Sequence, residues 1–206
     1  MSRVCVYIDG FNLYFGLKSK GWRKHYWLDL RSLAGCLLKP GQQLEKVHYF
    51  TARIKSDGHN QKDLQRQNTY LEALDTLPGL QTHYGQFLEK QHQCRNCGAK
   101  WIGYEEKMTD VNIAVQMLTD AFEDRFDTAI LISGDSDLTT PIKTLRSQFP
   151  DKYLIVAFPP NRHSKELSVA AHTSFQVGET KLRQSQLPPS VRRQDGYRLE
   201  RPEAWR

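Results

Sequence analysis

The sequence predicts an α/β fold with a mostly parallel central sheet and helices on both of its faces. Short runs of apolar and β-branched residues alternate along the chain with segments whose apolar residues recur at helical spacing. The strand-like runs are apolar at consecutive positions, which is typical of parallel strands buried on both faces. Strands that alternate with helices form a parallel sheet, whose binding crevice lies at the carboxyl ends of the strands.

Each element of the first half of the chain follows from its local pattern. Residues 3 to 8 form an apolar strand that ends at Asp9-Gly10, and residues 11 to 19 follow as a helix. Leu30, Leu33 and Leu37 share one face of a helix expected over residues 28 to 38. Proline and glycine pairs end that helix and the next. The remaining elements are a strand at 47 to 52, a helix at 61 to 77 and a strand at 81 to 88.

The second half repeats the alternation. Residues 109 to 122 carry the clearest helical pattern of the chain, and Thr109 is the expected N-cap. A buried strand follows at 128 to 132, and Asp137 is placed to cap the helix after it. The last elements are a strand at 153 to 158, a helix at 164 to 171 with Ser164 as its cap, and a strand near 175 to 177.

Two segments interrupt this pattern. Residues 89 to 104 are polar and contain Cys94-x-x-Cys97, so we expect a protruding loop inserted into a domain that spans residues 1 to 178. From residue 179 to residue 206, prolines and scattered charges replace the periodic pattern, and basic residues outnumber acidic ones. This second segment is therefore predicted to be an extended, basic C-terminal tail.

Four aspartates stand where strands end or helices begin. Asp9 follows the first strand, Asp110 opens the long helix, and Asp135 and Asp137 follow the strand at 128 to 132. Each alone is equally well explained as a turn former or a helix cap. Several carboxylates at one edge of a parallel sheet repel one another unless a cation lies between them, and hard oxygen ligands suit Mg²⁺ or Mn²⁺. The combination favours a metal site.

Three segments that contain these aspartates resemble a known family. "YIDGFNLYFGL" (7 to 17), "EEKMTDVNIAVQML" (105 to 118) and "LISGDSDLTTPIKTL" (131 to 145) are similar to the signature segments of the NYN-domain family, a PIN-like group of predicted ribonucleases. The resemblance covers residues 3 to 178 in the family's order, and "RHSKEL" (162 to 167) is similar to a feature of one bacterial branch.

The resemblance implies a PIN-like fold with one metal site for Mg²⁺ or Mn²⁺. Its implied catalytic and metal-binding residues are Asp9, Asp110, Asp135 and Asp137, with no departure from the family pattern at these positions. Asn12 and Ser133 match polar positions expected to hold substrate or water, and Glu106 and Lys107 match less closely. The implied reaction is hydrolysis of RNA phosphodiester bonds by an endoribonuclease.

The cysteine pair is the sequence's second metal candidate. Cys94 and Cys97 have the spacing of half a zinc ribbon, but a structural zinc site normally has four ligands. His83, His92 or the same loop of a second subunit in a homodimer would have to supply the others. An ordinary loop with two reduced thiols is the alternative reading.

The net charge and the composition indicate which classes of binding partner to expect. The formal net charge of +6 favours a polyanion such as RNA. Arg23 and Lys24 stand in a basic and aromatic segment that is either a nucleic-acid contact or a solvated face, whereas Trp27 is expected to pack in the core. No apolar run reaches the roughly 18 residues of a membrane helix, and the N-terminus lacks signal-peptide features, so we expect a cytoplasmic protein without membrane contact.

Two other functions remain open from the residues. A non-catalytic nucleic-acid-binding or regulatory module could retain the acidic site for metal-dependent stability. A small-molecule hydrolase of the haloacid-dehalogenase type is less favoured, because its nucleophilic aspartate is followed two residues later by a second acid, whereas Asp9 is followed by Gly10-Phe11. A nucleotide-triphosphate or dinucleotide site has no supporting glycine-rich motif.

Overall fold

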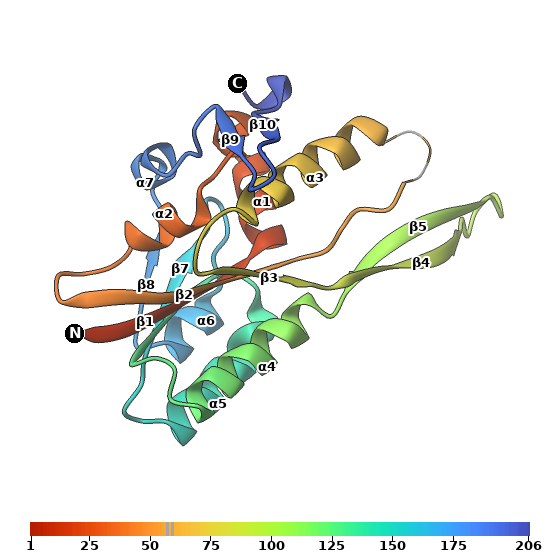
Figure 1. The fold of residues 1–206 in the computed structure, drawn as a ribbon. Helices are drawn as coiled ribbons and strands as arrows, with labels where there is room; N and C mark the ends of the chain where they lie inside the picture. The colour runs from red at the N-terminus through yellow and green to blue at the C-terminus, as the bar shows by residue number, and fades with distance from the viewer. Residues whose placement is uncertain (57, 59) are drawn as a thin grey trace.

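Parallel strands form the central sheet of the computed structural model, which describes residues 1–56, 58 and 60–206 (Figure 1). In this described part of the chain the sheet has six strands in the order β3-β2-β1-β6-β7-β8, and every neighbouring pair is parallel. The strands are β1 (Ser2–Asp9), β2 (Gln42–Thr51), β3 (Leu80–Tyr84), β6 (Thr128–Ile132), β7 (Tyr153–Phe158) and β8 (Thr173–Gln176).

Helices cover both faces of this sheet (Figure 1). One face carries α1 (Gly10–Ser19), α2 (Leu30–Gly35), α3 (Gln61–Leu74) and α7 (Glu179–Gln184), whose buried leucines share a hydrophobic cluster. The other face carries α4 (Thr109–Phe122), α5 (Thr139–Gln148) and α6 (Lys165–Ala170), which form a second cluster. The α/β class, the parallel sheet and the helices on both faces are therefore confirmed.

Strand β1 shows why this arrangement follows from the sequence. Successive side chains of a strand point to opposite faces of the sheet. Val4, Val6 and Ile8 accordingly lie in the cluster beneath α1 to α3, whereas Cys5 and Tyr7 lie in the cluster beneath α4 to α6. All five side chains are at most 1% exposed, so a central strand of this kind must be apolar at every position.

Two predicted helix caps are wrong. Met108, not Thr109, occupies the N-cap position of α4, and the backbone amide and hydroxyl of Thr109 donate to the Glu106 carboxylate. Asp137 lies inside a short 3-10 helix, η2 (Ser136–Leu138), whose cap is Asp135. Both errors are small shifts along the chain, because any polar side chain near a helix start resembles a cap in the sequence. The predicted Ser164 cap of α6 is confirmed.

The predicted strand at 81 to 88 is divided in two. Its first part is β3, and its second part joins β4 (Gln86–Gln93), which leaves the sheet and pairs antiparallel with β5 (Lys100–Lys107). Gly85 lies at the division, where a Cβ atom would come within 2.6 Å of the Glu106 carboxylate and 2.7 Å of the Lys107 carbonyl oxygen. Only a glycine therefore allows the two segments to pass so closely.

The expected loop at 89 to 104 is mostly a β-hairpin, so the loop prediction is wrong in its local structure. The β4–β5 hairpin projects away from the sheet, as the protruding position predicted (Figure 1). Its apolar side chains stay exposed, with Trp101 at 53% and Ile102 at 57%. A hairpin that is solvated on both faces lacks the alternation of buried and exposed residues by which a strand is recognised.

The C-terminal 28 residues are not an extended tail. They contain α7, a small antiparallel pair of strands, β9 (Ser190–Arg192) and β10 (Arg198–Glu200), and the 3-10 helix η3 (Glu203–Trp205). Leu187, Val191 and Leu199 pack with Trp27 in a third hydrophobic cluster. The Trp27 indole nitrogen donates to the Pro188 carbonyl oxygen at 2.8 Å. Trp27 is fully buried as expected, but its cover comes from this segment.

Two further features complete the fold. A third 3-10 helix, η1 (Arg23–His25), connects α1 to the segment before α2. Among the described residues, every helix is too short or too polar to cross a lipid bilayer.

Candidate metal centre

The carboxyl ends of two neighbouring strands bring the first acids together. Strands β1 and β6 pair in the middle of the sheet, with Ile8 opposite Ile132. The residues that follow, Asp9 and Ser133, therefore emerge side by side at the same edge. The Ser133 hydroxyl donates to the Asp9 carboxylate at 2.8 Å and accepts a hydrogen bond from the Asp135 backbone amide at 3.0 Å. One buried serine thus fixes Asp9 relative to the loop that carries Asp135 and Asp137.

Asn12 makes the second link between these loops. Its side-chain oxygen accepts a hydrogen bond from the Gly134 amide at 3.0 Å, while its own backbone amide donates to Asp9 at 2.9 Å. Asn12 and Ser133 were expected to hold substrate or water. The structure gives both of them internal partners, so their observed role is to position the acids.

Helix α4 supplies the third acid, Asp110, in its first turn. The helix start is held by Glu106 at the end of β5, which accepts from the Thr109 backbone amide at 3.1 Å. Burial, together with the negative charges of Asp9, Asp135, Glu106 and Asp137, raises the pKa of Asp110 to about 7. The helix therefore brings Asp110 into the electrostatic field of the other predicted acids.

The pKa of Asp9 is raised as well. Its side chain is only 3% exposed, and burial raises its pKa to about 6 even though the hydrogen bonds from Asn12 and Ser133 oppose that rise. The charges of Asp135 and Glu106 add to the increase. Asp9 and Asp110 are thus carboxylates whose ionised forms the protein compensates only in part.

No basic side chain in the described part of the chain forms an ion pair with Asp9, Glu106, Asp110, Asp135 or Asp137. The described residues also contain no group of three or more His, Cys, Asp or Glu side chains already close enough together to hold an ion. The carboxylate donors suit Mg²⁺ or Mn²⁺ chemically, and an ion would offset their repulsion. The side chains nevertheless have to draw closer to chelate one.

Three basic residues were predicted to contact substrate, and the structure gives each of them different neighbours. Lys107 lies 3.4 Å from Glu105, and Lys24 forms an ion pair with Glu179 at 3.0 Å. Arg23 instead lines a cavity of about 590 Å³ that begins beside the acidic edge. The sequence analysis missed this cavity and its other basic residues, Lys18 and Arg66, because they come from separate helices and form no motif.

Cys94 and Cys97 lie at the tip of the β4–β5 hairpin as reduced thiols. Neither predicted histidine ligand is directed to them. His92 stacks on Trp101 with ring centroids 5.4 Å apart, and His83 lies within hydrogen-bond distance of His48, at 2.9 Å. Within the described residues of one chain, neither histidine completes a zinc site with this cysteine pair.

Comparison with protein families identifies the chain. The model of the NYN domain matches residues 3–178, which contain all four aspartates and the central sheet. The chain belongs to the NYN-domain family. The match ends just before α7, so the C-terminal segment that covers Trp27 lies outside the matched NYN domain.

Two curated proteins are similar to this chain at low identity. The chain is 26% identical to the 6-hydroxy-3-succinoylpyridine 3-monooxygenase HspA of Pseudomonas putida, over 70% of this chain and 56% of that protein. It is 25% identical to the low amplitude and bright protein LabA of Synechococcus elongatus, over 71% of this chain and 69% of that protein. The chain thus spans little more than half the length of HspA.

A solved structure shares the fold. The protein of unknown function VPA0982 from Vibrio parahaemolyticus superposes with a TM-score of 0.54 at 16% identity, and the match covers 90% of this chain and 96% of that one. At this identity the likeness establishes the NYN fold alone.

Proposed function

We propose that this NYN-domain protein is a metal-dependent endoribonuclease that hydrolyses RNA phosphodiester bonds. The observation that carries the proposal is that Asp9, Asp110 and the Asp135/Asp137 loop interact electrostatically without a basic ion-pair partner among the described residues. Burial, with the repulsion among these acids, raises the pKa of Asp9 to about 6 and of Asp110 to about 7. Protein sites accumulate uncompensated carboxylates mainly where a cation or a proton is to be handled.

The chain's own residues have separate tasks in this proposal. Asp9, Asp110, Asp135 and Asp137 hold Mg²⁺ or Mn²⁺, which when bound stabilises phosphate charge and acidifies a water molecule. Asn12 and Ser133 keep the two acid-bearing loops in register through their hydrogen bonds to Gly134 and Asp9. One of these carboxylates would in addition accept a proton from the attacking water molecule.

Family membership alone does not choose this reaction. HspA is named as a monooxygenase and LabA by a phenotype, so the names of these two relatives do not agree on one reaction. The acidic edge favours phosphodiester hydrolysis because its donors are all oxygen ligands, supplied by the carboxyl ends of β1 and β6 and by the first turn of α4.

The test is cleavage of end-labelled single-stranded and structured RNA, with DNA controls, in Mg²⁺ and in Mn²⁺. Asp135→Asn should lower the cleavage rate by about 100-fold or more, because the carboxylate that it removes helps to hold the ion. Asp151→Asn is the matched control, since Asp151 precedes β7 at the opposite edge of the sheet and should keep full activity.

Cleavage that persists in chelator, or that survives Asp135→Asn unchanged, would overturn the proposal. RNA binding without cleavage in either metal would instead assign the protein as a nucleic-acid-binding module.

A further inference from the structure

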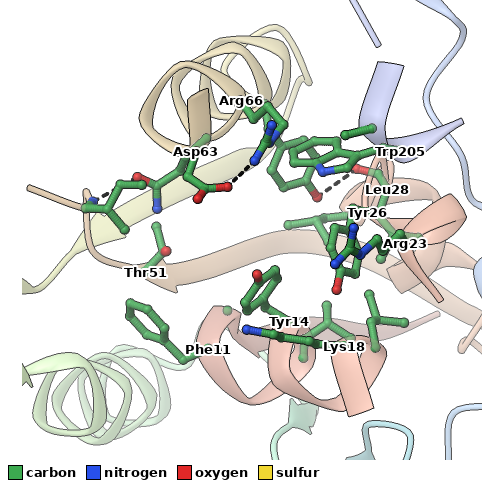
Figure 2. Close-up of a pocket in the computed structure, with 18 of the residues that line it drawn as sticks. Phe11, Tyr14, Lys18, Arg23, Tyr26, Leu28, Thr51, Asp63, Arg66 and Trp205 are labelled. Atoms are coloured by element: carbon green, nitrogen blue, oxygen red, sulfur yellow. Dashed lines mark hydrogen bonds and ion pairs between the residues drawn. The ribbon is translucent and has the colours of Figure 1, made fainter. Parts of the chain in front are cut away.

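A cavity of about 590 Å³ lies between α1, α3 and the C-terminal segment (Figure 2). Its volume falls within the roughly 300 to 1,000 Å³ of typical small-molecule sites. Its wall begins at Gly10 and Phe11, the two residues directly after Asp9, and includes Thr51, which follows the β2 residue paired with Asp9. The cavity is therefore continuous with the edge of the sheet that carries the candidate metal centre.

Aromatic rings line this cavity from three separate segments. Tyr14 comes from α1, Tyr26 follows η1, and Trp205 belongs to η3 at the end of the chain (Figure 2). The ring centroids of Tyr14 and Tyr26 are 5.1 Å apart, and those of Tyr26 and Trp205 are 5.7 Å apart. Tyr14 is 40% exposed. The exposed ring of Tyr14 therefore provides a stacking surface for a flat ligand.

The charged groups of the cavity are mainly basic. Lys18, Arg23 and Arg66 line it together with one acid, Asp63, which is paired with Arg66 (Figure 2). In the described part of the chain, Lys18 and Arg23 form no ion pair with an acid. A ligand that complements this cavity has a flat ring system and at least one negative charge.

We infer that the cavity binds one unstacked nucleotide of a single-stranded RNA, with its base against Tyr14 and a phosphate near Lys18 and Arg23. This inference rests on the proposed ribonuclease function and adds the substrate class, because a base held in a duplex cannot turn into such a cavity. The cavity and the acidic edge of the sheet then hold neighbouring parts of one RNA strand. The C-terminal segment contributes by placing Trp205 as one wall.

The chain offers two matched pairs of variants. Tyr14 and Phe15 are neighbouring exposed aromatic residues of α1, at 40% and 43% exposure, but only Tyr14 lines the cavity. Arg23 and Lys24 are neighbouring exposed cations, but Lys24 is paired with Glu179 and lies outside the lining. Because all four residues are exposed and none belongs to a buried hydrophobic cluster of the described part of the chain, their truncation should leave the fold intact, which thermal unfolding would verify.

The experiment measures binding of a fluorescent single-stranded RNA hexamer by anisotropy in chelator and low salt. Tyr14→Ala should weaken binding about tenfold, the loss of one stacked base, and Arg23→Ala several-fold. Phe15→Ala and Lys24→Ala should bind as the wild type does. A blunt duplex of the same sequence and a free nucleoside 5′-monophosphate should both bind much more weakly than the hexamer.

Equal affinity of Tyr14→Ala and Phe15→Ala would overturn the inference, as would equal binding of duplex and single strand. Tighter binding of the free mononucleotide would assign the cavity to a small nucleotide instead of a strand. Since no metal is present and cleavage is not measured, the result is independent of the nuclease test. Binding with this pattern in a protein that cuts no RNA would leave the cavity assignment standing and the proposed reaction overturned.

Discussion

Asp9 combines two roles in one side chain. One carboxylate oxygen caps α1 by accepting from the Asn12 amide, and the other accepts from Ser133 while facing the neighbouring acids. The position of Asp9 after an apolar strand predicts a site residue there, and this role stays a prediction. Its link to Ser133 was not predictable, because the two residues are 124 positions apart and meet only when β1 pairs with β6.

A second buried polar group lies two residues earlier on the same strand, at Tyr7, on the face of the sheet that packs against α4. Asp120 accepts from Tyr7 at 2.7 Å and pairs with His48 at 3.1 Å, and His48 in turn contacts His83. Burial lowers the pKa of His83 to about 4, and His48 and Lys46 lower it further while Asp120 opposes them. Tyr7 and Cys5 also face this network, and their pKa values are raised by burial.

The low pKa of His83 predicts a pH dependence of stability. Below pH 6.5 the unfolded chain takes up a proton at this histidine that the folded protein refuses until about pH 4. The free energy of unfolding should therefore fall as pH is lowered from 6.5 towards 4, by about 1 kcal/mol from this half-exposed group after solvent screening. Denaturant titrations at pH 7.5 and pH 5 should show a smaller difference for His83→Gln than for the wild type, and an equal difference would contradict the prediction.

The β4–β5 hairpin is the element that depends least on the rest of the fold. None of its side chains belongs to the hydrophobic clusters of the described residues. Its base is fixed by Phe87, whose ring meets Phe11 edge to face at 5.8 Å, and by Gly85 at the exit from the sheet. The arm beyond this base carries exposed residues and the cysteine pair.

Shortening this arm should leave the domain stable. Lys90 and Gly103 are paired across the hairpin, so an Asn-Gly turn can replace residues 91 to 102. We expect thermal unfolding to shift by no more than about 2 to 4 °C, which corresponds to roughly 1 kcal/mol for a chain of this size. Phe87→Ala is the contrasting variant and should lose about 1 kcal/mol of aromatic packing. A large loss of stability in the shortened protein would show that the arm packs on the domain.

At the scale of the whole molecule, the C-terminal segment covers part of the hydrophobic core. Residues 179 to 206 follow the part of the chain that matches the NYN model, yet Leu187, Val191 and Leu199 are at least nine-tenths buried against Trp27. The same segment also places Trp205 in the wall of the cavity of about 590 Å³. Core and candidate binding site thus both depend on residues that the sequence pattern assigned to a tail.

Leu199→Ala should therefore lower the free energy of unfolding by about 2 to 4 kcal/mol, because it opens a cavity in a packed cluster. Arg198→Ala, one residue earlier on the exposed side of β10, should change it by less than about 0.5 kcal/mol. Chemical denaturation of the two variants makes the comparison. Equal stabilities would mean that the segment is detached in solution.

The sequence by itself determined the α/β class, the strands that carry the acids and the four aspartates, because these follow from apolar runs and from residues adjacent to them. Tertiary structure decided the internal roles of Asn12 and Ser133, the hairpin, the packed C-terminal segment and the cavity lined by Tyr14, Arg23 and Trp205. The physical reason is distance along the chain. A local pattern records whether a residue is buried, but contacts between remote segments exist only after the sheet has brought those segments together.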